Sequence, residues 1–219
     1  MLLLKGDLGT GKSTFARAFI RALAHGAEFD VPSPTFTLVQ TYDETRVPVA
    51  HADLYRIGSA QELDELGFDE LIRTHVLAVE WPEKMLDENH PDRLLIELSG
   101  SGSHRDAVIT AHGAWEQALA RNAMINLFLA TTRWANAERR FLEGDASFRR
   151  YETLHLGREA SILMDMPARP DGPPVKHGKP YSAIAHLAED IRAVIAVNGL
   201  LGERGYSAPR AESYDLAQG

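Results

Sequence analysis

Short apolar runs, each ended by glycine or a charged residue, alternate with amphipathic stretches through the first half of the chain. Apolar runs of about 4–8 residues are typical of buried β-strands, whereas helices place apolar residues three or four positions apart. The strands predicted in this way are residues 2–4, 35–39, 47–54, 76–79, 94–98 and 107–110. One helix is predicted from Ser13 to Gly26, with Phe15, Phe19, Ala22 and Leu23 on one face. A second runs from Ser59, which forms a capping box with Glu62, to about Ile72.

The pattern changes after about residue 113. Helices are predicted through Trp115 and Phe128 and over residues 134–142, followed by a strand at 162–164, a proline-rich loop and a helix from Ser182 to about Leu201. We therefore expect two domains, an α/β sheet with flanking helices at residues 1–120 and a smaller α+β module at residues 121–219.

Composition narrows the class of protein. The 219 residues include no cysteine, which excludes disulfides and thiolate metal sites. No apolar run approaches the ~20 residues that cross a bilayer, and the apolar start is too short for a signal peptide, so a cytoplasmic protein without a membrane segment is predicted. Residues 1–120 hold 10 Lys and Arg against 19 Asp and Glu, so this part is not expected to bind nucleic acid through a general basic surface.

One motif carries specific chemistry: Gly6-Asp7-Leu8-Gly9-Thr10-Gly11-Lys12-Ser13 matches the P-loop pattern G-x-x-x-x-G-K-[ST] at every fixed position. Its glycines let the backbone curl so that N–H groups point at phosphate oxygens, and the following helix adds its positive N-terminal end. Lys12 is predicted to reach the β and γ phosphates, and the Ser13 hydroxyl to ligate Mg²⁺. The match lies between an apolar strand and an amphipathic helix, the setting this motif requires.

A P-loop needs a carboxylate near the metal, and two acidic residues end predicted strands: Asp53 and Glu80. Spacing alone does not rank them. One could coordinate the metal while the other orients the attacking water or holds Ser13. Thr35, on a loop stiffened by prolines, is a candidate sensor of the γ-phosphate or simply the start of a strand. His51 shows no metal-ligand spacing, so no special chemistry is predicted for it.

Four motifs in this order, GDLGTGKST, SPTFTLV, HADLYRI and VEWPEK, resemble those of the TsaE (YjeE) family, the ATPase subunit of the tRNA threonylcarbamoyladenosine system. The resemblance covers roughly residues 1–112. It implies a P-loop fold, Mg²⁺-dependent ATP binding and a weak ATPase activity that partner proteins stimulate. It also implies a role in modifying adenosine 37 of tRNA, with TsaB-like and TsaD-like proteins as partners and tRNA reached only through their complex.

The resemblance also implies site residues. Ser13 and Glu80 resemble the family's Mg²⁺ ligands, and Asp53 its acidic residue in the HADLYR segment. Lys12, Asp53 and Glu80 are the implied catalytic residues. Because the family has a strand and a helix before the P-loop strand, we expect the N-terminal edge to be truncated; the alternative is that this protein manages without that edge. The implied ATP contacts are Gly9, Thr10, Gly11, Lys12, Ser13, Thr14, Thr35 and Arg105.

Residues 121–219 resemble the N-terminal lobe of an aminoglycoside-phosphotransferase-like sugar kinase. Residues 144–151 are similar to its nucleotide-covering loop and residues 162–167 to its next strand. The lysine expected in that strand is missing, and Met164 lies near its place. The chain has no catalytic loop of that family, so phosphotransfer by this part alone is not expected. Two alternatives to the ATPase hypothesis remain: a small-molecule kinase within a longer parent, and a nucleotide-sensing scaffold that does not hydrolyse ATP.

Overall fold

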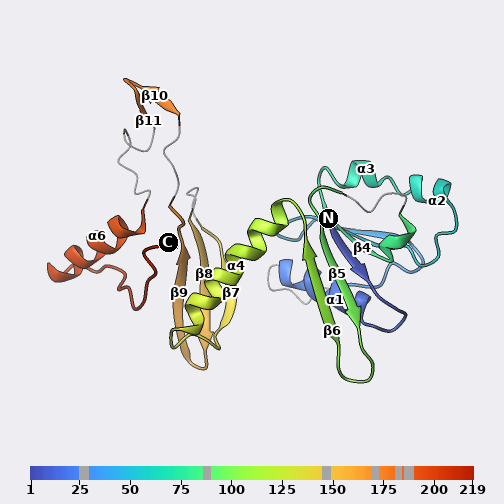
Figure 1. Ribbon diagram of the computed structural model, residues 1–219, viewed down its shortest axis with the longest axis horizontal. Coiled ribbons are helices and arrows are strands. Elements are labelled where there is room, and N and C mark those ends of the chain that lie inside the picture. Colours follow the sequence, from blue (N-terminus) through green and yellow to red (C-terminus); the bar gives the residue numbers. More distant parts are fainter. Residues whose placement is uncertain (25–29, 86–89, 145–148, 169–172, 181–183, 185–189) are drawn as a thin grey trace. The chain divides into compact units, whose positions relative to one another are not determined.

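The structure is a computed structural model that describes the chain except residues 25–29, 86–89, 145–148, 169–172, 181–183 and 185–189 (Figure 1). It divides into two compact units, Met1–Ala120 and Arg121–Gly219. Helix α4 (Ala114–Ala130) crosses this boundary and contributes residues to both units.

The first unit is built on a six-stranded sheet with the order β2-β3-β4-β1-β5-β6. The four central strands run parallel, and the two edge strands β2 and β6 pair antiparallel to their neighbours. This is a mixed α/β sheet, as the alternation of strands and helices predicted. The strands are β1 (Leu2–Lys5), β2 (Val39–Tyr42), β3 (Val49–Asp53), β4 (Val76–Glu80), β5 (Leu94–Ser99) and β6 (Asp106–Ala111).

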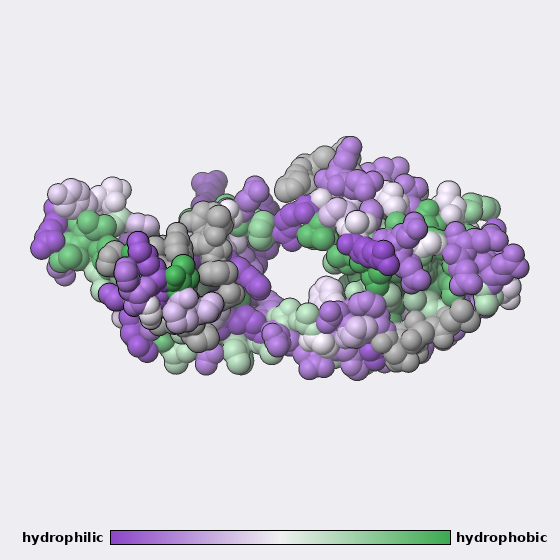
Figure 2. Space-filling model, turned by 90° about the horizontal axis from the view of Figure 1, so that it is seen from above, coloured by the Kyte–Doolittle hydropathy of each residue, from purple (hydrophilic) through white to green (hydrophobic). Residues whose placement is uncertain are grey.

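Both faces of this sheet are covered, which explains why its central strands read as continuous apolar runs. Leu2 and Leu4 pack with Ile20 of α1 (Lys12–Leu23) on one face. Leu3 packs on the other face, beneath the side that carries α2 (Ala60–Asp64), α3 (Phe68–Leu71) and the 3₁₀ helix η1 (Pro82–Lys84). The three leucines are at most 1% exposed. Figure 2, viewed from the side on which α2 and α3 lie, shows mostly hydrophilic residues over this part of the unit.

Two predicted elements of the first unit are corrected. The strand expected at residues 35–39 begins only at Val39, because residues 35–37 form a turn in which the Leu38 amide donates to the Pro34 carbonyl at 2.6 Å. The helix expected from Ser59 to about Ile72 is two short helices, interrupted by Gly67 at φ 67°. The predicted capping box is present, since Ser59 Oγ accepts the Glu62 amide and donates to the Glu62 carboxylate.

The second unit contains a three-stranded antiparallel sheet with the order β7-β8-β9, packed against the second part of α4. Leu129 of α4 and Trp134 share a small buried cluster with Leu154 and Leu163 of the sheet. The other elements are β7 (Glu138–Leu142), β8 (Arg150–Leu156), β9 (Glu159–Asp165), β10 (Pro174–Lys176), β11 (Lys179–Pro180) and α6 (Ile191–Glu203).

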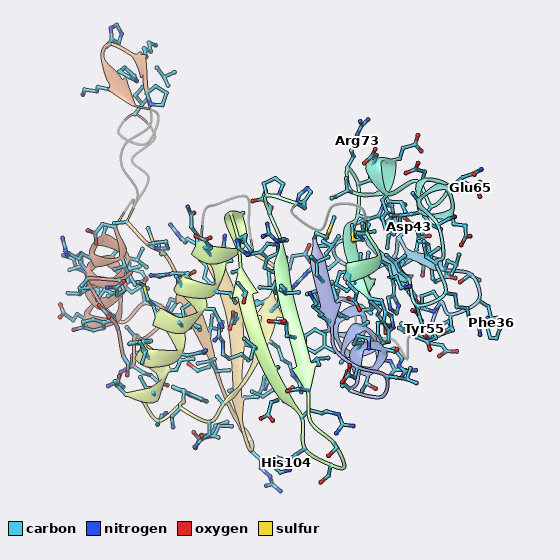
Figure 3. All side chains as sticks on the ribbon, turned by 45° about the vertical axis from the view of Figure 1, so that its right-hand side comes forward. Phe36, Asp43, Tyr55, Glu65, Arg73 and His104 are labelled. Atoms are coloured by element: carbon cyan, nitrogen blue, oxygen red, sulfur yellow. The ribbon has the colours of Figure 1, made fainter. Side chains whose placement is uncertain are left out.

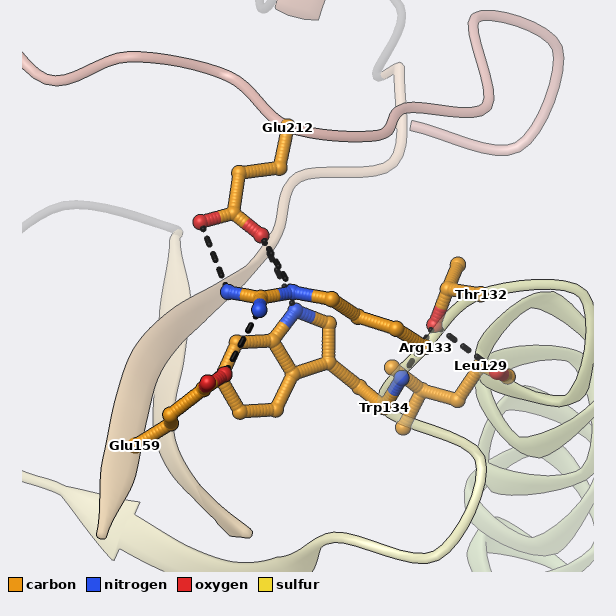
Figure 4. A network of polar contacts seen from close by, with 6 residues as sticks. All are labelled: Leu129, Thr132, Arg133, Trp134, Glu159 and Glu212. Carbon is orange, nitrogen blue, oxygen red and sulfur yellow. Dashed lines mark hydrogen bonds and ion pairs between the residues drawn. The ribbon is translucent and has the colours of Figure 1, made fainter.

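An ionic network ties the C-terminal segment to this sheet unit (Figure 4). The Glu212 carboxylate accepts hydrogen bonds from the Trp134 indole at 3.2 Å and from the Arg133 guanidinium at 3.2 Å. Arg133 also donates to Glu159 at 2.6 Å and lies over the Trp134 ring. The bond from Trp134 is the main cause that holds the pKa of Glu212 below its usual range, followed by the bond from Arg133.

Three predictions for the second unit are corrected or limited. Residues 138–142 form β7 rather than the second half of a helix, because they pair with β8, a strand that was not predicted. The helix expected from Ser182 to about Leu201 is interrupted at Asp190, which is extended and caps α6, the helix that begins at Ile191. Residues 182–183 and 185–189 lie outside the described residues. Half of the segment 144–151, which is similar to a nucleotide-covering loop, lies outside the described residues, at positions 145–148. Within the described part of the chain, no helix is both long and apolar enough to span a bilayer.

Candidate functional site

The glycine-rich loop follows β1 directly and leads into α1. Gly6, Gly9 and Gly11 all have positive φ angles, which residues with a Cβ rarely adopt. Gly6 is also confined, because a Cβ there would lie 2.3 Å from the carbonyl oxygen of Leu98. Gly11, the N-cap residue of α1, lies in the left-handed region and makes no side-chain cap hydrogen bond. The loop therefore ends at an uncapped helix N-terminus, a geometry that favours an anion.

Lys12 is buried at the inner edge of this loop, with 5% of the residue exposed. Its ammonium donates to the carbonyl oxygens of Gly6 at 2.6 Å and Asp7 at 2.9 Å and lies 3.7 Å from the centre of the Trp81 ring. Burial lowers the pKa of Lys12, and nearby carboxylates, of which Glu80 acts most strongly, oppose that shift. The site thus holds a desolvated cation that an anionic ligand would stabilise.

Glu80 lies at the carboxyl end of β4 and is 2% exposed. One carboxylate oxygen accepts the Ser13 hydroxyl at 2.8 Å, and the other lies 2.9 Å from Nε2 of His51. Mg²⁺ takes oxygen ligands and commonly uses only one or two from the protein, so the Ser13 hydroxyl and the Glu80 carboxylate fit this ion chemically. The structure brings these two predicted metal ligands together.

Asp53 occupies a different position at the end of β3, opposite Glu80 in the parallel register. Its carboxylate accepts the Thr35 hydroxyl at 3.2 Å and the Tyr55 amide at 3.1 Å. Thr35 in turn shares a hydrogen bond with Ser33. The two carboxylates that spacing could not rank therefore have separate partners: Glu80 contacts the P-loop serine, and Asp53 contacts the loop that carries Thr35.

Arg105 reaches the P-loop from the β5–β6 hairpin, whose tip carries His104 (Figure 3). Its guanidinium donates to the carbonyl oxygens of Thr10 at 3.0 Å and Gly9 at 3.1 Å, and also to two carbonyls of its own hairpin. The resemblance implied an ATP contact for Arg105. In the structure, its hydrogen bonds support the backbone of the loop.

Sequence reasoning missed His51. It is fully buried in β3, and Glu80 is the one hydrogen-bond partner of its side chain among the described residues. Alternation along the strand was the available signal, because it places His51 on the same sheet face as Asp53, next to the strand that ends in Glu80. Trp81, which follows Glu80, packs against the core cluster that contains Leu3, and its ring also contacts the Lys12 ammonium and Tyr55.

The central strands of the sheet are parallel, and a glycine-rich loop leads from β1 into α1. Acidic residues end β4, which lies beside β1, and β3, which lies beside β4. Together these features define a P-loop NTPase-like α/β domain. A family model described as "Threonylcarbamoyl adenosine biosynthesis protein TsaE" matches residues 1–107. The protein of that name from Bacillus subtilis is 36% identical over 115 residues, which cover 52% of this chain and 70% of that protein. The chain belongs to the TsaE family.

The matches are confined to part of each protein. The TsaE protein of Rickettsia conorii is 35% identical over 114 residues, covering 51% of this chain and 65% of that protein. The TsaE protein of Rickettsia felis is 42% identical over 83 residues, which cover 48% of that protein. The chain therefore spans about half to two thirds of the length of these relatives. The crystal structure of Bacillus subtilis YdiB aligns with a TM-score of 0.45 and 30% identity, covering 57% of this chain and 76% of that one.

Proposed function

We propose that the first unit binds Mg·ATP at the glycine-rich loop and hydrolyses it slowly, as the ATPase component of tRNA threonylcarbamoyladenosine biosynthesis. The observation that carries this proposal is the arrangement of Lys12, Ser13 and Glu80 around an uncapped helix N-terminus. The pathway is that of the TsaE relatives from Rickettsia conorii and Bacillus subtilis.

Binding would exchange one set of contacts for another. The Lys12 ammonium now donates to loop carbonyls, and phosphate oxygens are stronger, charged acceptors for it. The uncapped N–H groups at the start of α1 would take further phosphate oxygens. A bound Mg²⁺ would neutralise charge on the phosphates. The contribution of the protein to the chemistry is therefore mainly positional and electrostatic.

The two carboxylates suit different tasks in this scheme. Glu80 is bound to Ser13 and would hold the metal side of the site, together with the Ser13 hydroxyl. Asp53 is bound to Thr35 and would link the end of β3 to the loop containing residues 33–37, so that the position of this loop depends on the ligand. Gly9, Thr10, Gly11 and Thr14 would supply the rest of the phosphate cradle.

The test is release of inorganic phosphate from Mg·ATP by the purified chain. Lys12→Ala and Glu80→Gln should each abolish release above a no-enzyme blank. Arg73→Ala should leave it unchanged, because Arg73 is an exposed cation near the beginning of β4, at the opposite end of that strand from Glu80 (Figure 3). Equal release by the parent and Lys12→Ala would show that the activity does not come from this site. Binding without release would favour the nucleotide-sensing scaffold.

We further propose that TsaB-like and TsaD-like proteins are the partners and that tRNA is reached through them. The acidic balance of residues 1–120 supports a protein partner rather than direct binding to the tRNA backbone. Addition of such partners should accelerate phosphate release, whereas addition of tRNA alone should not. Stimulation by tRNA alone would contradict the indirect role.

For the second unit we propose the N-terminal lobe of an aminoglycoside-phosphotransferase-like kinase. Its antiparallel sheet followed by a helix supports this proposal. It encloses a cavity of about 610 Å³ lined by α4, the sheet, α6 and the C-terminal segment. We expect no phosphorylated sugar when the 219-residue chain is incubated with ATP and N-acetylated hexoses; formation of such a product would instead favour the kinase alternative.

A further inference from the structure

We infer that His51 is a positioning residue, which holds the Glu80 carboxylate in the orientation that faces Ser13. The functional part of this inference rests on the proposed Mg·ATP chemistry of the site. The structural part, a hydrogen bond donated from His51 to Glu80, can be tested without nucleotide.

The complete burial of the His51 side chain indicates that its imidazole has a specific role. His51 has no exposed surface and lies in β3, between the apolar strand positions Ala50 and Ala52. An apolar side chain would fill such a position without polar atoms to satisfy. Nδ1 of His51 has no hydrogen-bond partner among the described residues, so only one nitrogen of the buried imidazole makes a hydrogen bond. That nitrogen, Nε2, lies 2.9 Å from Glu80 Oε1.

The partner fixes the proton position. An ionised carboxylate can only accept hydrogen bonds, so Nε2 must carry the proton in the bond to Glu80. A proton on Nδ1 would be a buried donor without an acceptor, which costs free energy. The Nε2–H tautomer, with an unprotonated Nδ1, therefore satisfies the pair at the lowest cost.

The bond has a consequence for the metal side of the site. The terminal torsion of a glutamate is broad, so one hydrogen bond does not fix both carboxylate oxygens. With Oε1 held by His51, Oε2 stays directed at the Ser13 hydroxyl. Glu80 also lies near the Lys12 ammonium, on which it exerts the strongest Coulombic influence. Without His51 the carboxylate would be free to turn toward that cation and away from Ser13.

The first experiment observes the imidazole nitrogens by NMR in the nucleotide-free chain. We expect protonated Nε2 and unprotonated Nδ1 for His51, with a signal that shifts in Glu80→Gln and disappears in His51→Gln. His75 is the matched control, because its Nε2 lies 2.9 Å from Asp43, a carboxylate on the surface of the same unit. Its signal should not respond to Glu80→Gln. A His51 ring protonated at Nδ1 and not at Nε2 would overturn the inference.

The second experiment measures the gain in ATP affinity that Mg²⁺ provides, by calorimetry with Mg²⁺ and with EDTA. His51→Leu should reduce this gain by about 10- to 100-fold, the usual effect of losing a residue that orients a metal ligand. The affinity in EDTA should not change. His51→Gln should restore most of the gain, because its side-chain amide can still donate to Glu80, and His75→Leu should behave like the parent. In a Glu80→Gln background, where the gain is already lost, His51→Leu should add nothing.

A purely structural role gives a different pattern. His51→Leu would then lower affinity equally with Mg²⁺ and with EDTA, His51→Gln would not rescue it, and the effect would add to that of Glu80→Gln. Thermal unfolding of each variant identifies any loss of folded protein. If the parent binds no Mg·ATP, the proposed function fails, and the NMR measurement still decides whether His51 donates to Glu80.

Discussion

Gly6 lies in the glycine-rich loop at a position where the backbone leaves no room for a single added carbon. Its φ of +142° lies outside the regions open to other residues, a strain of about 1–3 kcal/mol for alanine. A Cβ would lie 2.3 Å from the Leu98 carbonyl oxygen and 2.8 Å from Thr10 Oγ1. The nearer atom is backbone at the end of β5, so overpacking adds about 1–3 kcal/mol. The lower entropy of unfolded alanine offsets about 0.4–1 kcal/mol. Gly6→Ala should therefore lower the free energy of unfolding by about 1–6 kcal/mol.

Gly102→Ala is the matched control, since Gly102 has φ +64° and no atom lies within 4 Å of its added Cβ. It carries only the cost of the left-handed conformation, about 1–2 kcal/mol before the same offset. Hydrogen exchange of peptides from β1 and β4 at increasing urea concentrations would report the first unit within the intact chain. Equal losses for the two variants, or no loss for Gly6→Ala, would refute the reasoning from close approach.

Three further predictions concern charged residues. Arg105→Met should weaken Mg·ATP binding about ten-fold in calorimetry, because two hydrogen bonds to the carbonyls of Gly9 and Thr10 are lost. Arg105→Lys should be nearly as weak, since an ammonium does not match this forked geometry; full affinity would indicate that charge alone matters. Glu212 has a folded pKa below its unfolded value, so its ionised form stabilises the fold above about pH 4.3. At pH 7 the parent should therefore have a larger free energy of unfolding than Glu212→Gln. Urea titrations should show that this difference vanishes as the pH falls through the folded pKa of Glu212, and a difference that does not change with pH would contradict the prediction. The folded pKa of Lys12 is below its unfolded value of about 10.4. The parent should therefore gain stability relative to Lys12→Met as the pH rises toward that value. A difference in the free energy of unfolding that stays constant with pH in denaturant titrations would exclude the shift.

The central sheet could be predicted because its strands are buried on both faces. Leu2, Leu3 and Leu4 are all in the core, and a continuous apolar run ending in glycine signals such a strand from local sequence alone. The P-loop could also be predicted from local sequence, because the positive φ angles that it requires are adopted by two of its own residues, Gly9 and Gly11.

The errors arose where distant residues decide the conformation. Residues 134–142 contain alanine, glutamate and arginine, which favour helix, yet residues 138–142 pair with β8 and Arg139 makes a bidentate ion pair with Glu152. At residues 35–37, local β-propensity was overridden by a turn closed on the Pro34 carbonyl.

The candidate site was partly predictable. Strand ends identified Asp53 and Glu80, but their different partners depend on residues 18 and 67 positions away in the chain. The contact of Arg105 with the loop spans 95 positions, and the buried pairing of His51 with Glu80 needs the register of β3 and β4. No local pattern contains that information.

The claim on which the proposed function depends is that the glycine-rich loop binds the phosphates of ATP. Equilibrium titration of the folded chain with ATP, with Mg²⁺ and with EDTA, tests it most directly. We predict saturable binding at one site per chain that Mg²⁺ strengthens and that Lys12→Ala removes. Absence of Mg²⁺-dependent binding by folded parent protein, or equal binding by folded Lys12→Ala, would contradict it.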